Sequence, residues 1–114
     1  MSDQDTSLPG ELSAAEAAVV VATGRASIVD VREQVEWDAG HIAGALLLPL
    51  SELTGRLGEL PDGDLVIVCR SGARSEMVCS ALIQSGRAAA NLIGGMLAWA
   101  GAELPIEPPG GHVL

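Results

Sequence analysis

The sequence predicts an α/β domain in which a parallel sheet of four to five strands lies between helices on both faces. Short apolar, β-branched runs alternate with segments of helical spacing along most of the chain, and this alternation is typical of a parallel sheet with right-handed crossovers. The run Leu65–Val68, followed by Cys69, is apolar at every position and therefore predicts a central strand covered on both faces. At 114 residues, the chain fits one domain.

The first predicted helix extends from Leu12 to Gly24 and has a clear start and stop. Ser13 suits the N-cap, Glu16 follows three residues later as its capping-box partner, and Gly24 ends the helix. Strands are predicted at residues 26–31, about 45–48, 65–69 and 89–93. Further helices are predicted at residues 32–40, 51–60 with Ser51 as N-cap, about 75–86, and 94–104.

The two ends of the chain differ in composition from the middle. Residues 1–10 are polar and acidic and predict a flexible N-terminal segment, whereas residues 11–104 hold all the predicted elements and form the domain. Residues 105–114 are rich in Pro and Gly, which predicts a weakly ordered tail.

Charge and composition exclude several classes of partner. The net charge is -9 and all six basic residues are Arg, so binding to a nucleic-acid backbone is not expected. The start of the chain lacks the basic end and apolar run of a secretory signal, and no window approaches the length of a membrane span. We therefore expect a cytoplasmic protein, and its size and acidic surface favour a monomer. No metal-ligand cluster is visible, and no cofactor is expected.

The segment that follows the central strand has the composition of an anion-binding loop. Cys69 stands where the strand ends and the next helix begins, which is the edge where parallel α/β sheets bind ligands. We call residues 69–75 the Cys69 loop; after the cysteine it contains Arg70, Ser71, Gly72, Ala73, Arg74 and Ser75. Small, flexible residues at its centre allow several backbone N–H groups to point inward over the sulfur.

The same donors and arginines favour a thiolate over a thiol at Cys69. A cysteine at a helix N-terminus beside positive charge has a pKa below that of a free cysteine, and the thiolate is the nucleophilic form. Cys69 is therefore predicted to be catalytic, without a separate general base. The remaining six residues of the loop are predicted to bind an anionic substrate. The alternative is a buried, inert cysteine with two solvated arginines.

Three motifs together resemble the rhodanese (sulfurtransferase) homology domain. DVREQVEWDAGHIAGALLLPL is similar to the N-terminal signature of that family, CRSGARS to its active loop, and IGGMLAW to its C-terminal signature. The motifs occur in the family's order and cover about residues 28–99. The resemblance implies a three-layer rhodanese-like fold.

The resemblance also implies a reaction. Cys69 would take a sulfane sulfur from thiosulfate or a similar small anionic donor, form a persulfide and release sulfite. A thiophilic acceptor (cyanide, a thiol or a sulfur-relay protein) would then remove the sulfur. Arg70 and Arg74 would steer and anchor the anion, with Arg74 also a structural brace.

Two other functions remain open at this stage. Rhodanese-like domains also serve as non-catalytic binding or sulfur-relay modules, although the presence of Cys69 favours chemistry. A phosphatase or arsenate reductase is a weaker alternative, because four residues separate Cys69 from Arg74, whereas phosphatase loops have five.

Several other polar residues are candidates for structural roles. Asp30 and Arg32 follow a strand and are expected to brace loops rather than to touch substrate. His41 lies between glycine turns and is expected to bond backbone groups. Glu36 could pair with an arginine near the site or remain a solvated surface carboxylate.

The tryptophans, the second cysteine and the last histidine are also given structural interpretations. Trp37 and Trp99 are expected to pack, the latter over the Cys69 loop, with pocket lining as the alternative. Cys79 has apolar neighbours and is interpreted as a core thiol, although it could instead resolve the persulfide as a disulfide. His112, in the tail, has no evident partner.

Overall fold

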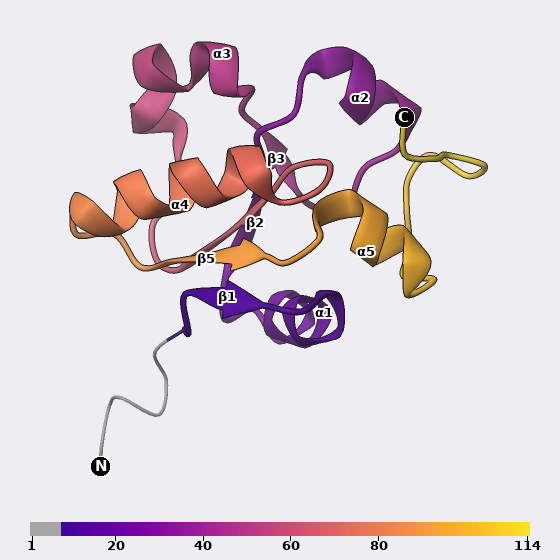
Figure 1. The fold of residues 1–114 in the computed structure, drawn as a ribbon, viewed down its shortest axis with the longest axis horizontal. Coiled ribbons are helices and arrows are strands. Elements are labelled where there is room, and N and C mark those ends of the chain that lie inside the picture. The colour runs from indigo at the N-terminus through magenta and orange to yellow at the C-terminus, as the bar shows by residue number, and fades with distance from the viewer. Residues whose placement is uncertain (1–7) are drawn as a thin grey trace.

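The computed structural model describes residues 8–114, which form a five-stranded parallel sheet between two layers of helices (Figure 1). The order across the sheet is β1-β5-β4-β2-β3. The strands are β1 Glu11–Leu12, β2 Ser27–Asp30, β3 Leu46–Leu47, β4 Leu65–Val68 and β5 Ala89–Leu92. The α/β class is confirmed, and β4 lies at the centre of the sheet, as its apolar run predicted.

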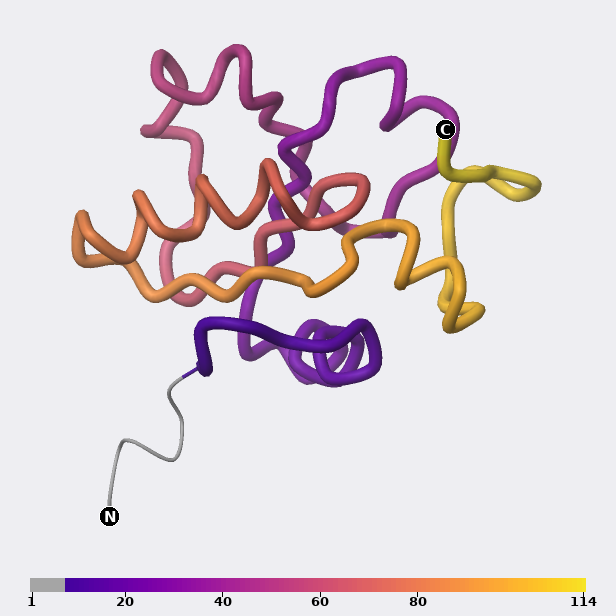
Figure 2. Tube along the Cα trace, viewed as in Figure 1, coloured from indigo at the N-terminus to yellow at the C-terminus, as the bar shows by residue number. Residues whose placement is uncertain are grey.

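Helices cover both faces of this sheet. They are α1 Ala14–Ala22, α2 Gln34–Ala39, α3 Leu50–Leu53, α4 Ala73–Gln84 and α5 Gly95–Gly101, and a 3-10 helix, η2 Thr54–Glu59, follows α3. Helices α1 and α5 pack on one face, whereas α3 and α4 pack on the other (Figure 2).

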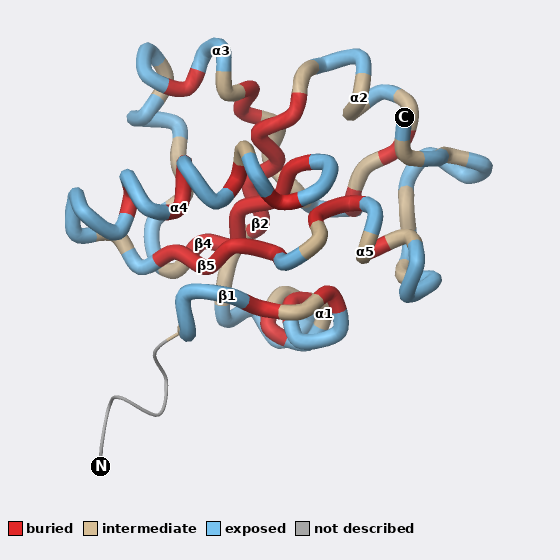
Figure 3. The backbone as a smooth tube through the Cα atoms, in the orientation of Figure 1, coloured by how far each residue is buried: buried red, intermediate tan, exposed pale blue. Residues whose placement is uncertain are grey.

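The alternation of side chains along the strands divides the interior into two apolar cores. In β4, Val66 and Val68 pack with α1 and α5, whereas Leu65 and Ile67 pack with α4. Figure 3 shows β4 and β5 as continuously buried. A strand with both faces covered needs apolar residues at every position, and this requirement explains why β4 shows no polar alternation.

Helix starts follow local chemistry in one case and differ from expectation in two. At α1 the capping box is present, because Ser13 Oγ accepts the Glu16 amide hydrogen and the Glu16 carboxylate accepts that of Ser13. Ser51 is not an N-cap: α3 begins at Leu50, and Pro49 occupies the N-cap position. The Ser51 hydroxyl instead donates to the Glu33 carboxylate at 3.0 Å.

Helix α4 begins at Ala73, two residues before the expected start at Ser75. The reason is Gly72, whose φ of +111° turns the chain into the helix within the Cys69 loop, so that residues 73–75 of the loop form the first turn of α4. The early start matters for the site, because the first amides of α4 then lie close to Cys69.

Strand β1 was not predicted, and Leu12 lies in it rather than in the first helix, which begins at Ala14. The strand has only two residues and pairs with β5 through Glu11 and Asn91. Its length is too short for a strand pattern to be visible. Residues 1–7, which belong to the segment 1–10 predicted to be flexible, lie outside the described residues.

The tail, residues 105–114, packs on the domain, in contrast to the weak order expected from its composition. His41 and Glu107 exchange two backbone hydrogen bonds of 2.8 Å, and the His112 amide donates to the Ala39 carbonyl. Ile106 and Val113 pack against the core of the α1 face, and the apolar surface that they bury holds the segment on the domain. Among residues 8–114, no helix is both long enough and apolar enough to cross a membrane.

Candidate functional site

Cys69 lies at the carboxyl end of the central strand. It follows Val68 directly, and the chain then turns through three residues before α4 begins at Ala73. The residue is 1% exposed, so its sulfur lies at the base of the Cys69 loop. This is the edge of a parallel sheet at which the fold class places ligands.

Several hydrogen-bond donors converge on the Cys69 sulfur. The Gly72 amide lies 3.1 Å from Sγ, and the amide and hydroxyl of Ser75 each lie 3.3 Å from it. The amides belong to the first turn of α4 and its N-cap, where backbone N–H groups have no partner within the helix. The sulfur therefore occupies the position of an anion at a helix N-terminus.

These contacts determine the ionisation of Cys69. Burial on its own raises the pKa of the thiol, because it removes water from the charged form. Hydrogen bonds from the Ser75 hydroxyl and amide, and from the Gly72 and Ser71 amides, oppose this effect and outweigh it. The pKa of Cys69 is therefore lowered from its ordinary value, which increases the thiolate fraction at neutral pH.

Backbone hydrogen bonds connect the start of α5 to the Cys69 loop. The Met96 amide donates to the Cys69 carbonyl at 2.8 Å, and the Leu97 amide donates to the Arg70 carbonyl at 3.0 Å. This approach requires Gly95, because a Cβ there would lie 2.6 Å from the Arg70 carbonyl oxygen and would also overlap that of Cys69. The IGGM motif is thus explained as the place where a helix N-terminus meets the loop.

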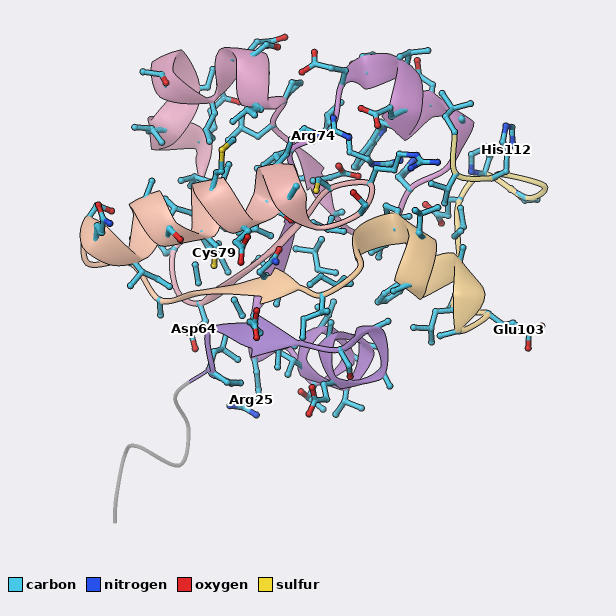
Figure 4. All side chains as sticks on the ribbon, viewed as in Figure 1. Arg25, Asp64, Arg74, Cys79, Glu103 and His112 are labelled. Carbon is cyan, nitrogen blue, oxygen red and sulfur yellow. The ribbon has the colours of Figure 1, made fainter. Side chains whose placement is uncertain are left out.

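Arg74, the last arginine of the loop, forms a two-pronged ion pair with Glu36 of α2. The nitrogen–oxygen distances are 2.8 and 3.0 Å, and Figure 4 shows Arg74 on the side of α4 that faces α2. The hydrogen bond from Arg74 is the main reason why the pKa of Glu36 falls to about 2. The pairing supports the bracing role given to Arg74 and answers the open question about Glu36.

The other predicted residues of the loop face outward. Arg70, Ser71 and Ala73 are exposed, and Arg70 Nε donates to the Leu114 carbonyl of the tail. Arg70 is therefore exposed and bonded to the tail, whereas Arg74 lies beside α2. Gly72 and Ser75 are buried and bond the sulfur directly.

Asp30 and Arg32 form a buried brace, as interpreted from the sequence. Both residues have 0% exposure, and the Arg32 guanidinium binds both Asp30 carboxylate oxygens at 2.8 to 3.1 Å. It also donates to the carbonyl of Glu36, within α2, and to that of Gly40, the C-cap of α2. This pair fixes α2, and with it Glu36, against the sheet.

His41 and Trp37 also have structural positions. Their rings are stacked with centroids 3.8 Å apart, and His41 Nδ1 lies 2.9 Å from the Trp37 carbonyl oxygen. Trp99 packs in the α1 core rather than over the Cys69 loop, and its Nε1 donates to Pro105. The prediction that Trp99 packs over the Cys69 loop was wrong, because Trp99 lies on the face of α5 that packs against α1.

Cys79 is a core thiol, as interpreted. It is 3% exposed, lies among the apolar residues of the α4 core, and is a free thiol, as is Cys69. Burial, and to a smaller extent the charge of Glu76, raise its pKa. Across residues 8–114, no three His, Cys, Asp or Glu side chains gather in a way that could hold a metal ion.

Asn91 of β5 belongs to the site, although sequence analysis missed it. Its side chain accepts a hydrogen bond of 2.6 Å from the Ser75 hydroxyl and donates to the Gly72 carbonyl at 3.3 Å. The available signal was a polar residue within an otherwise apolar predicted strand, AANLI.

Several relatives share much of the sequence, and some of them have sulfur-related names. The chain is 46% identical over 86 residues to a sulfurtransferase of Allochromatium vinosum, covering 74% of this chain and 80% of that protein. It is 43% identical to part of an HTH-type transcriptional regulator of Mycobacterium tuberculosis and 39% identical to part of a putative sulfur carrier protein of Bacillus subtilis. These two matches include 78% and 66% of this chain, but only 42% of the length of each of those proteins.

Solved structures give the same result for the fold. A rhodanese-related protein from Thermoplasma volcanium matches with a TM-score of 0.80 and 27% identity, covering 86% of this chain and 97% of that one. A rhodanese-like domain protein from Staphylococcus aureus matches with a TM-score of 0.73 and 31% identity, over 80% and 91% of the two chains. The model of the rhodanese-like domain family matches residues 13–102. Because the family model matches most of the chain and the fold agrees, the chain belongs to the rhodanese-like domain family. Its sulfurtransferase relative, together with the thiol in the donor-lined loop, gives it a role in sulfur transfer or relay.

Proposed function

We propose that this protein is a thiosulfate sulfurtransferase-like enzyme in which Cys69 carries the transferred sulfur. The observation that supports this most directly is the set of donors from Gly72 and Ser75 around the Cys69 sulfur. These donors stabilise a thiolate, which is the form that attacks a sulfane sulfur.

The reaction needs no external oxidant or reductant. The Cys69 thiolate attacks the outer sulfur of thiosulfate, the sulfur–sulfur bond of the donor breaks, and its electron pair leaves with sulfite. The product is a persulfide anion on Cys69. A nucleophilic acceptor (cyanide, a thiol or a thiol of a sulfur-relay protein) then attacks the terminal sulfur, and the Cys69 thiolate is the leaving group.

The Cys69 loop suits both steps of this cycle. The inward amides stabilise the thiolate before the attack and the negative charge of the persulfide after it. We assign the attraction of the anionic donor to Arg70, because it is exposed and bonded only to a backbone carbonyl of the tail in the contacts described, whereas the charge of Arg74 is paired with Glu36. Ser71 and Ala73 line the outer part of the loop, where the leaving sulfite would pass.

A sulfur-relay role is the second form of this proposal. One relative is named a putative sulfur carrier protein, and another is named a probable adenylyltransferase/sulfurtransferase of Mycobacterium tuberculosis, of which this chain spans 20%. In that form the acceptor is a protein thiol. We propose a monomer in the cytoplasm for both forms, as the composition suggests.

Mass spectrometry of the purified chain after treatment with thiosulfate tests the proposal. We expect the mass of one sulfur atom to be added to the wild type and to Cys79→Ser, and we expect no addition to Cys69→Ser. Turnover with thiosulfate and cyanide should follow the same pattern. An unmodified Cys69 thiol together with hydrolysis of an aryl phosphate would replace this proposal with the phosphatase alternative.

A further inference from the structure

Strand β5 carries a polar side chain in the interior of the protein. Asn91 is 7% exposed, and its neighbours Ala90 and Leu92 pack in the core on the α1 side. Because side chains alternate along a strand, Asn91 points to the opposite face, where α4 and the Cys69 loop lie. A buried amide is tolerated only where its donor and acceptor are both satisfied.

Both ends of the Asn91 amide bind the Cys69 loop. Nδ2 donates to the Gly72 carbonyl at 3.3 Å, and Oδ1 accepts from the Ser75 hydroxyl at 2.6 Å. A carbonyl can only accept a hydrogen bond, so Gly72 fixes which end of the amide faces it. The oxygen of Asn91 is thereby directed toward Ser75.

Gly72 and Ser75 are also the residues that bond the Cys69 sulfur. The Gly72 amide donates to Sγ at 3.1 Å and the Ser75 amide at 3.3 Å. The Asn91 side chain of β5 is therefore bonded to both of the residues whose amides converge on the sulfur.

We propose that Asn91 is a positioning residue that holds Gly72 and Ser75 so that their backbone amides stay directed at the Cys69 sulfur. Asn91 itself touches neither the sulfur nor a substrate. The inference deepens the proposed function, and it rests on Cys69 being the reacting sulfur.

The Ser75 hydroxyl shows why Asn91 matters. This group has one hydrogen, and three acceptors lie within reach: Asn91 Oδ1 at 2.6 Å, the Gly72 carbonyl at 3.2 Å and Cys69 Sγ at 3.3 Å. The contact with Asn91 Oδ1 is the shortest, so the hydroxyl hydrogen points mainly to Asn91, and the Gly72 and Ser75 amides are the donors that Asn91 keeps directed at the sulfur. Without Asn91, the loop loses this link to the sheet, and the two amides are held less firmly at their distances from Sγ.

The test measures the pH profile of Cys69 alkylation by iodoacetamide, in a Cys79→Ala background so that one thiol remains. We expect Asn91→Leu to shift the midpoint upward by roughly half a unit to one unit, which lowers the rate below the midpoint about threefold to tenfold. Ser75→Ala should shift the midpoint in the same direction. The double variant should shift it by less than the sum, because both changes act on one network.

A second variant, Asn91→Ala, keeps the test decisive if the leucine disturbs folding, and urea unfolding identifies which variants are folded. Val78→Ala, which shortens a buried side chain of α4 without touching the loop contacts, is the matched control and should leave the midpoint in place. An unchanged or lower midpoint in a folded Asn91 variant would overturn the inference. Because alkylation does not require sulfur transfer, that result would leave the thiosulfate experiment on Cys69 unaffected.

Discussion

The two cysteines of this protein lie ten residues apart and are almost equally buried, yet their thiols differ in acidity. Cys69 is 1% exposed and Cys79 is 3% exposed, and both belong to the core on the α4 side. The pKa of Cys69 is lowered, whereas that of Cys79 is raised. Figure 4 shows Cys79 on the side of α4 that faces β5.

The difference comes from the hydrogen-bond donors that surround each sulfur. Cys69 precedes α4 and receives amides that have no partner within the helix, whereas Cys79 lies in the second turn, where the amides are used by the helix itself. Burial raises the pKa of both thiols, and at Cys69 the donors reverse that effect. Burial alone therefore does not separate a reactive cysteine from an inert one.

The strongest way to break this contrast is to disturb the loop from α5. Gly95→Ala places a Cβ against the Cys69 and Arg70 carbonyls at a φ of +57°, and we expect it to cost about 2–4 kcal/mol in the free energy of unfolding. The pKa of Cys69 should rise toward that of Cys79, and sulfur transfer should fall sharply.

Gly101→Ala is the matched control, because a Cβ at Gly101 meets nothing within 4 Å. Because alanine is favoured over glycine in a helix, it should leave the free energy of unfolding unchanged or raise it by up to about 1 kcal/mol. Urea denaturation and alkylation profiles measure both effects. A Gly95→Ala protein with wild-type stability would contradict the close approach between α5 and the loop.

The next prediction measures the contrast itself. In the native protein at pH 7, iodoacetamide should alkylate Cys69 in a Cys79→Ala variant at least about a hundredfold faster than Cys79 in a Cys69→Ala variant, because the thiolate is the reacting form. In concentrated urea the two rates should become equal. Equal rates in the native state would mean that the donors around Cys69 do not ionise it.

A smaller effect is expected from Glu36, which holds Arg74 beside the loop. Glu36→Gln removes a negative charge and leaves the positive charge of Arg74 less compensated, so the pKa of Cys69 should fall further. We expect alkylation of Cys69 at pH 6 to accelerate about twofold to threefold. Glu52→Gln, which loosens the exposed ion pair with Arg56 far along the chain, is the control and should have no effect. A slower reaction in Glu36→Gln would show that orientation of Arg74 outweighs its charge.

The smallest expected effect is a difference in how pH changes stability. For Cys69 the folded pKa lies below the unfolded value of about 8.5, so its contribution is fully present above pH 8.5 and is lost as pH falls through the folded pKa. For Cys79 the folded pKa is the higher one, so its contribution is fully present below pH 8.5 and is lost as pH rises through the folded pKa.

Urea unfolding of Cys69→Ala and Cys79→Ala between pH 6.5 and 9.5 should therefore show opposite trends relative to the wild type. Cys69→Ala should gain less stability than the wild type as pH rises toward 8.5. Cys79→Ala should lose less above pH 8.5. Since one pKa unit corresponds to about 1.4 kcal/mol, these trends are small, and parallel curves for all three proteins would count against the assigned directions.

Much of this fold could be predicted from local pattern. The apolar run of β4 identified the centre of the sheet, and Ser13 with Glu16 identified the start of α1. Two features were not visible in this way: β1 is too short to show a pattern, and the tail is held by contacts with His41 and Ala39, which lie far from it in the sequence.

The sequence by itself determined that a cysteine stands at the carboxyl end of a central parallel strand, followed by a glycine-centred loop and a helix. Periodicity and turn chemistry depend on neighbours in the chain, so they can be read without a structure. Only the tertiary structure decided which distant groups complete the site. Glu36 reaches Arg74 across 38 residues and Asn91 reaches Ser75 across 16, because the parallel strands that carry or precede these groups end at a common edge.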